Sequence, residues 1–275
     1  MLLGALFLGY GVPSVRAQST IIFIADNLGN VARYDTNAGS GSALGSLSTN
    51  FTINQIIGAA YDATTGNVLL FDRYEHKVYV MNGTTGSSSL AFTTGSVVFQ
   101  GGAVLNGIVY GIDENTQSLA AYDYSGVSQP VSGVRLDSAT YNNDHVHTLG
   151  LVGTSLQLFY MTSKAGARAI GTDGTPGTVL LAPSAISLST FEDVDYFNGD
   201  YLVASYGSEI CRVDGSTGNH TVMFTSTQLS AMGVTGSVSG VAVIQAVPEP
   251  STWAMLLTGV AFVAVYVRRR TAKRA

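Results

Sequence analysis

The stretch NVLLFDRYEHKVYVMNGTTG, residues 67–86, contains the unit that decides the fold. It begins with an apolar run ending in Phe71-Asp72, passes through a polar turn into a second apolar run, and closes with Gly86. Short runs of β-branched and aromatic residues between Asp, Asn and Gly clusters predict a β-hairpin. Four other segments have the same order, with paired strands at 21–26 and 31–35, 108–113 and 119–123, 156–160 and 167–170, and 201–205 and 210–214. The body of the chain therefore consists of five copies of one β unit.

The spacing of these copies indicates a propeller. One polar residue marks the end of each copy's second strand, and successive marks are 47, 41, 50 and 41 residues apart: Asp35, Asn82, Asp123, Asp173 and Asp214. A period near 45 residues is typical of one four-stranded propeller blade. The expected fold class is all-β, a five-bladed β-propeller-like domain with a C-terminal transmembrane helix outside it. A pair of β-sandwiches is the alternative.

A closing strand is predicted near the end of the body. Each of the last four copies follows a strand of small residues, as expected where blades crowd around the axis: 58–62, 101–104, 149–152 and 194–196. The first copy has no such strand, but residues 240–244 (GVAVI) form one that has no copy of its own. We therefore predict that 240–245 pairs beside 19–25, because closing the ring hides sheet edges that otherwise promote aggregation.

Composition and charge narrow the class of protein. Charged residues make up 11% of the chain, against about 25% in an average protein, while Gly (32) and Tyr (14) are abundant. The body between Arg16 and Pro248 keeps 17 of the 18 acidic residues but only seven of the 13 basic ones, so its net charge is near −10. Such a body repels phosphates, which argues against nucleic acid as a partner. Cations or neutral glycans are better suited as ligands of a body with this negative charge.

Residues 1–17 have the features of a secretory signal peptide. The apolar run 2–12 is too short to span a bilayer, Pro13 ends it, and Val15-Arg16-Ala17 places small residues where a signal peptidase reads them. We expect cleavage after Ala17, which leaves residues 18–246 as the extracellular domain. A buried first strand is the alternative.

Residues 247–275 combine three parts. Val247-Pro248-Glu249-Pro250-Ser251 comes first, and its two prolines exclude a regular helix or a central strand there. The apolar residues 252–267 follow, and as a helix from Ser251 they would rise about 25 Å, close to the ~30 Å hydrocarbon core of a membrane. Arg268, Arg269 and Arg270 then supply a stop-transfer signal that stays cytoplasmic. We expect a single transmembrane helix with the β domain outside.

This arrangement resembles the PEP-CTERM sorting domain, in which a Pro-Glu-Pro motif, a hydrophobic helix and an Arg-rich end stand at the extreme C-terminus. The resemblance rests on residues 248–250 together with the apolar and basic segments. It implies recognition by an exosortase, a membrane peptidase that cuts near the motif, in Gram-negative bacteria that make exopolysaccharide. The implied location is the periplasm, cell surface or exterior, with a membrane anchor before processing. A plain single-span anchor with a Pro-rich linker is the alternative.

Two clusters are candidate metal sites. His145 and His147 alternate along one strand face and could hold a metal if a third ligand came from elsewhere, which the sequence does not identify. Glu192, Asp193 and Asp195 precede or enter an inner strand, where carboxylates in a propeller channel could bind Ca²⁺. For both, a solvated loop is the alternative. No cofactor other than Ca²⁺ is expected, and the single cysteine, Cys211, is expected to be a small buried residue.

The sequence favours a non-enzymatic function. It contains no G-x-S-x-G, H-E-x-x-H, Walker A or G-x-G-x-x-G motif, so no catalytic residue is assigned. We expect an exported binding or structural module acting at the cell surface or in an exopolysaccharide matrix. The alternatives are a propeller enzyme, such as a lyase or glycan hydrolase, and a Ca²⁺- or glycan-binding module. Seven tyrosines recur at repeat positions, where packing is the expected role and stacking on sugar rings the alternative: Tyr34, Tyr61, Tyr79, Tyr110, Tyr122, Tyr196 and Tyr206.

Overall fold

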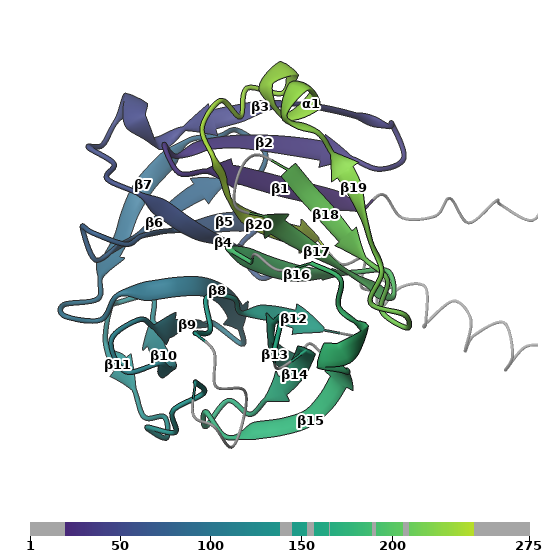
Figure 1. Cartoon of the computed structure of the whole chain (residues 1–275). Helices are drawn as coiled ribbons and strands as arrows, with labels where there is room; N and C mark the ends of the chain where they lie inside the picture. The colour runs from purple at the N-terminus through teal and green to yellow at the C-terminus, as the bar shows by residue number, and fades with distance from the viewer. Residues whose placement is uncertain are drawn as a thin grey trace, which may run out of the picture.

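The computed structural model describes residues 20–137, 145–152, 157–164, 166–188, 191–205 and 209–244. These residues form five antiparallel four-stranded sheets arranged around one axis (Figure 1). The innermost strands contact one another around a closed cycle. The prediction of a five-bladed propeller is therefore confirmed, and the pair of β-sandwiches is wrong.

The blades follow the order of the sequence, apart from the strand that closes the first. From the axis outward they are: blade 1, β20 (Val238–Ile244), β1 (Ile21–Asp26), β2 (Asn30–Asp35) and β3 (Ser40–Ser46); blade 2, β4 (Ile56–Asp62), β5 (Asn67–Asp72), β6 (Lys77–Asn82) and β7 (Ser88–Thr93); blade 3, β8 (Phe99–Leu105), β9 (Ile108–Asp113), β10 (Ser118–Asp123) and β11 (Ser128–Gln129); blade 4, β12 (Gly150–Val152), β13 (Gln157–Thr162), β14 (Gly166–Ile170) and β15 (Pro176–Leu181); blade 5, β16 (Asp193–Phe197), β17 (Asp200–Ser205), β18 (Glu209–Val213) and β19 (His220–Phe224).

Ring closure occurs as the sequence predicts. β20 pairs antiparallel with β1, with Ile21 opposite Ile244 and Ile24 opposite Val241. Gly240 of β20 packs against β4 so closely that a Cβ there would lie 2.9 Å from the Cβ of Ala59. Crowding at the axis is thus the physical reason for the small residues of the inner strands.

The repeat marks are turns with a common construction. In each copy the marking side chain accepts a hydrogen bond, 2.9–3.0 Å long, from the backbone N–H two residues later. The glycine that follows has a positive φ, between 63° and 86°, in all five copies: Gly39, Gly86, Gly126, Gly174 and Gly218. The glycine lies four residues after the mark in three copies, three residues after it in blade 3 and one residue after it in blade 4. An Asx turn with a left-handed glycine in it or just after it explains why Asp or Asn and Gly recur together.

The hydrophobic core is divided among the blade interfaces. Five clusters of buried residues occur, and each joins two neighbouring blades. Phe71, for example, packs edge-on to Phe99 between blades 2 and 3, and Cys211 is buried between blades 4 and 5. Of the recurring tyrosines, Tyr79, Tyr110 and Tyr122 are buried, which confirms packing as their role.

The chain's predicted end segments are outside the described residues. These are the signal peptide at 1–17 and the sorting motif, apolar helix and Arg cluster at 247–275. The only α-helix within the described ranges is α1 (Ser226–Ala231), capped by Thr225 and Gln228. No helix in that part of the chain has the length and apolar character needed to cross a membrane.

Candidate functional site

A polar cavity of about 230 Å³ lies at one end of the propeller axis. It is found where the inner strands β4, β8, β12 and β16 begin, beside the turn that joins β5 to β6. We call it the mouth cavity, defined by its lining residues Gln55, Ile57, Arg73, Tyr74, Gln100, His147 and Glu192. It therefore collects side chains from four of the five blades or from the loops leading into them.

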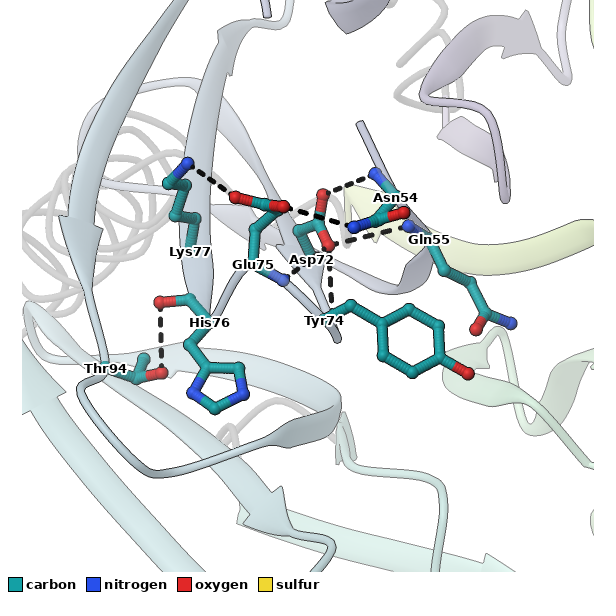
Figure 2. Close-up of polar contacts among 8 residues, drawn as sticks. All are labelled: Asn54, Gln55, Asp72, Tyr74, Glu75, His76, Lys77 and Thr94. Atoms are coloured by element: carbon teal, nitrogen blue, oxygen red, sulfur yellow. Dashed lines mark hydrogen bonds and ion pairs between the residues drawn. The ribbon is translucent and has the colours of Figure 1, made fainter. Parts of the chain in front are cut away.

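Asp72 positions two of these residues, as Figure 2 shows. At the end of β5 its carboxylate accepts the backbone N–H groups of Tyr74 (3.2 Å) and Glu75 (3.1 Å), which shapes the turn. It also accepts those of Asn54 (3.1 Å) and Gln55 (3.5 Å), which precede β4. One buried carboxylate thus holds the turn and the preceding loop together, and the side chains of Gln55 and Tyr74 extend to the same side (Figure 2).

The charged groups of the cavity are largely neutralised. Arg73 forms a bidentate ion pair with Glu114 of blade 3, with Nε 2.7 Å from Oε2. The hydrogen bond to Glu114 raises the pKa of Arg73. Glu192 is partly buried, and burial raises the pKa of its carboxyl, although the charge of Arg73 partly opposes this shift. The one arginine that the described residues place in the cavity lining therefore has a counter-charge, and the cavity holds one carboxyl that resists ionisation.

Gln100 enters the cavity through an irregularity in β8. The pairing of β8 with β9 shifts register between Gln100 and Gly102, and Gly101 has a φ of +60°. A Cβ on Gly101 would lie 2.8 Å from the carbonyl oxygen of His147 and 2.7 Å from the N of Leu149. Only glycine fits this bulge, and bulges of this kind redirect neighbouring side chains. Gln100 is 2% exposed, and its Oε1 has no hydrogen-bond partner among the described residues.

His147 lines the cavity and His145 lies next to it. Their ring centroids are 6.2 Å apart. The segment is fixed by its buried neighbours, since Val146 N–H donates to Gln117 Oε1 (2.8 Å) and the Thr148 hydroxyl bonds to both backbone groups of Met161. Within the described ranges, no group of three His, Cys, Asp or Glu side chains is close enough to share a metal ion. A metal at His145 and His147 stays a prediction.

The three acidic residues of blade 5 do not lie together. Glu192 lines the mouth cavity, whereas Asp193 is fully buried and Asp195 lines a second cavity at the other end of the axis. Asp193 Oδ2 accepts the backbone N–H groups of Ala59 (2.9 Å) and Val241 (3.0 Å). Asp195 accepts those of Val243 (2.7 Å) and Tyr196 (2.8 Å). These carboxylates connect the inner strands of different blades, and Ca²⁺ binding by the cluster stays a prediction.

The other end of the axis differs in character. A smaller cavity of about 50 Å³ is lined there mainly by apolar residues, among them Ala60, Leu151 and Val243, with Asp195 as its one carboxylate. Burial raises the pKa of Asp195 to about 7, against the opposing effect of its backbone hydrogen bonds. The polar groups that could bind a ligand are therefore concentrated at the mouth.

The sequence pattern did not predict five of the seven residues that line the mouth cavity: Gln55, Ile57, Arg73, Tyr74 and Gln100. Arg73 and Tyr74 lie within the repeat unit that decided the fold, in the turn after Asp72, where the other copies have different residues. Tyr74 is 60% exposed, whereas the six tyrosines at repeat positions that the structure describes are buried or half-buried. The sequence signal for Arg73 and Tyr74 was therefore that they differ from the residues at the same place in the other copies. Residues that all copies share are expected to stabilise the blade and not to bind a ligand.

Comparison with known proteins identifies the C-terminal segment. Residues 246–270 match the PEP-CTERM protein-sorting motif, as the sequence indicated. The motif indicates an exported protein that an exosortase sorts to the cell envelope. A comparison with curated proteins finds no match.

Solved structures support the fold. A chain in the crystal structure of a nidogen/laminin complex superposes with a TM-score of 0.58 at 12% identity, covering 82% of this chain and 98% of that one. A structural genomics protein of unknown function from Bacteroides thetaiotaomicron gives a TM-score of 0.50 at 15% identity, covering 68% of this chain and 54% of that one. At these identities the similarity concerns the fold alone.

Proposed function

We propose that this chain is an exported, exosortase-processed protein whose propeller is a non-enzymatic binding module with the mouth cavity as its ligand site. The observation that carries the proposal is the combination of a sorting motif at residues 246–270 with a closed propeller that ends at Ile244. The binding domain is thus joined directly to the sorting signal. The proposal includes anchoring by residues 252–267, retention of the Arg268–Arg270 cluster inside, and display within an exopolysaccharide matrix.

The direction of the closing strand supports the proposal that the mouth cavity is displayed to the exterior. β20 begins at Val238, which pairs with Asp26 at the end of β1. Asp26 lies at the same end of the axis as the mouth cavity, because it ends β1 as Asp72 ends β5. Ile244, where β20 ends, pairs with Ile21 at the other end of the axis. The chain therefore leaves the propeller on the face away from the mouth cavity. An anchor that follows would hold the mouth toward the exterior.

The test is the C-terminus of the mature protein in a host with the cognate exosortase. Mass spectrometry should find wild type without the residues beyond about 251, and therefore without Arg268–Arg270. Changing Pro248, Glu249 and Pro250 to alanine should leave full-length protein in the membrane with the propeller still folded. The matched control is wild type in the same host lacking the exosortase, which should also stay full-length. Recovery of wild type ending at Ala275 would overturn the sorting proposal.

An enzyme is the second candidate, and one observation favours it. Glu192 has a raised pKa and interacts electrostatically with Arg73, which is paired with Glu114. Glu114 does not line the cavity, but two carboxyl groups in different electrostatic environments thus flank one arginine. Such a pair is what glycan hydrolysis requires. Release of reducing sugar from a glycan by wild type, and its loss in Glu192→Gln, would favour the enzyme over the binding module.

A further inference from the structure

We propose that the mouth cavity binds one neutral sugar ring, such as the terminal residue of an uncharged glycan. The inference rests on the proposed binding function and specifies the ligand class. It is carried by the side chains that line the cavity, by their charges, and by one buried amide that has no protein partner.

The charges exclude the ionic classes of ligand. An anionic ligand would find the guanidinium of Arg73 already engaged by both carboxylate oxygens of Glu114, and among the described residues Arg73 is the only Lys or Arg that lines the cavity. A cationic ligand would meet the guanidinium of Arg73 and a carboxyl whose ionisation is disfavoured. Buried charges without a partner are costly, so a neutral ligand with many polar groups fits best.

The hydrogen-bonding groups suit hydroxyls. Gln100 lies 98% buried against the cavity with its Oε1 unpartnered by any described residue. Leaving such a group without a partner costs about 1–3 kcal/mol. Oε1 is itself buried, so a ligand hydroxyl would remove this cost once the Gln100 side chain turned its amide toward the cavity. Gln55 adds a second amide, and each amide both donates and accepts. Vicinal hydroxyls of a sugar offer the same mixture of donors and acceptors.

The rim of the cavity suits the apolar face of a ring. Tyr74 is 60% exposed, and its ring is oriented by the guanidinium of Arg73, 5.4 Å from the ring centroid. An exposed aromatic ring beside polar groups provides an apolar body with a polar edge. The cavity, about 230 Å³, is smaller than the ~300–1,000 Å³ typical of sites for drug-sized ligands. It has room for one small ring and not for an extended chain.

The test is calorimetric titration of the folded protein with the methyl glycosides of glucose, galactose and mannose, with glucuronate and inorganic phosphate as anionic probes. Saturable binding of at least one methyl glycoside is expected, tighter than binding of glucuronate. Gln100→Met should weaken that binding about tenfold, the effect of one buried hydrogen bond. It should leave the melting temperature unchanged or raised, since it removes an unpartnered polar atom. Gln129→Met, on the outermost strand of blade 3, is the matched control and should bind as wild type.

The stacking contribution has its own pair of variants. Tyr74→Ala should weaken binding about tenfold, while Tyr74→Phe should retain most of it. Leu28 is the matched control, because it follows Asp26 in blade 1 as Tyr74 follows Asp72 and is 50% exposed. Leu28→Ala should not affect binding.

Three results would overturn the inference. The first is tighter binding of glucuronate or phosphate than of any neutral glycoside. The second is wild-type affinity for the glycoside in Gln100→Met. The third is no binding of any probe, which would leave ordered water as the partner of Gln100. If none binds while the C-terminus is still processed, the ligand class is wrong and the sorting proposal stands. Cleavage of a glycoside bond during titration would instead replace the binding module by the enzyme.

Discussion

Asp193 Oδ2 accepts the backbone N–H of Val241 at 3.0 Å, and this bond joins blade 5 to the strand that closes blade 1. The same oxygen accepts the N–H of Ala59 in blade 2. The other oxygen, Oδ1, is buried and has no partner among the described residues. Burial raises the pKa of this carboxyl well above its usual range. A single side chain thus connects three inner strands at the cost of a desolvated carboxyl group.

We expect Asp193→Ala to lower the free energy of unfolding and Asp193→Asn to leave it unchanged or raise it. The amide oxygen of Asn can still accept both N–H groups without the cost of a buried charge, so Asp193→Asn should be as stable as wild type or more stable at pH 7. Asp193→Ala leaves two buried N–H groups unpaired, and each costs about 1–3 kcal/mol. Urea denaturation measures both. Equal destabilisation by the two variants would show that the charge itself, and not the acceptor, holds the strands.

Asp195 should make stability depend on pH. Its pKa is raised from 3.8 to about 7 in the folded state, so the folded protein binds the proton more tightly than the unfolded chain. Stability from this group is fully present below pH 3.8 and is lost as pH rises through about 7. At 1.36 kcal/mol per pKa unit the loss is at most about 4 kcal/mol. The unfolding free energy of Asp195→Asn should therefore rise relative to wild type between pH 4 and pH 8. A constant difference across that range would contradict the raised pKa.

Removing the closing strand should destabilise the entire propeller. Deletion of residues 237–246 removes β20, exposes the edge of β1, and takes away the N–H donors that Asp193 and Asp195 accept. We expect a melting temperature lower by ten degrees or more, or no cooperative transition. Deletion of residues 247–275 is the control and should leave the melting temperature of the propeller unchanged. If both deletions melt like the intact protein, closure does not contribute to stability.

Asp72 should matter for the ligand as well as for the turn. Asp72→Ala removes the acceptor for four backbone N–H groups, those of Asn54, Gln55, Tyr74 and Glu75. Because Gln55 and Tyr74 would then be misplaced, the variant should bind the sugar at least tenfold more weakly. Asp26→Ala in blade 1 is the matched control, because Asp26 caps the equivalent turn and does not line the mouth cavity. It should lower stability by a similar amount and leave binding intact. Equal loss of binding in the two variants would indicate a global effect.

The fold could be read from the sequence because it repeats. Residues such as Asp123 recur with a period of 41–50 residues, each followed by a glycine such as Gly126, because every blade has an Asx turn with a left-handed glycine. Residues 240–244 stood out because the first copy lacked an inner strand. The mouth cavity could not be read in this way. Its residues lie up to 137 positions apart, from Gln55 to Glu192, and Gln100 enters it through a bulge at Gly101 that no repeat predicts. Asp193 and Asp195 were recognised as channel residues, but their backbone partners on other blades depend on the closed ring.

The most direct test of the binding account is an NMR titration that follows the side-chain amide signals of Gln55 and Gln100 as the tightest methyl glycoside is added. The account predicts that both signals shift and saturate at the midpoint measured by calorimetry, with the signal of Gln129 unmoved. Saturation at that midpoint with both mouth signals unmoved would place the ligand elsewhere on the protein and contradict the account.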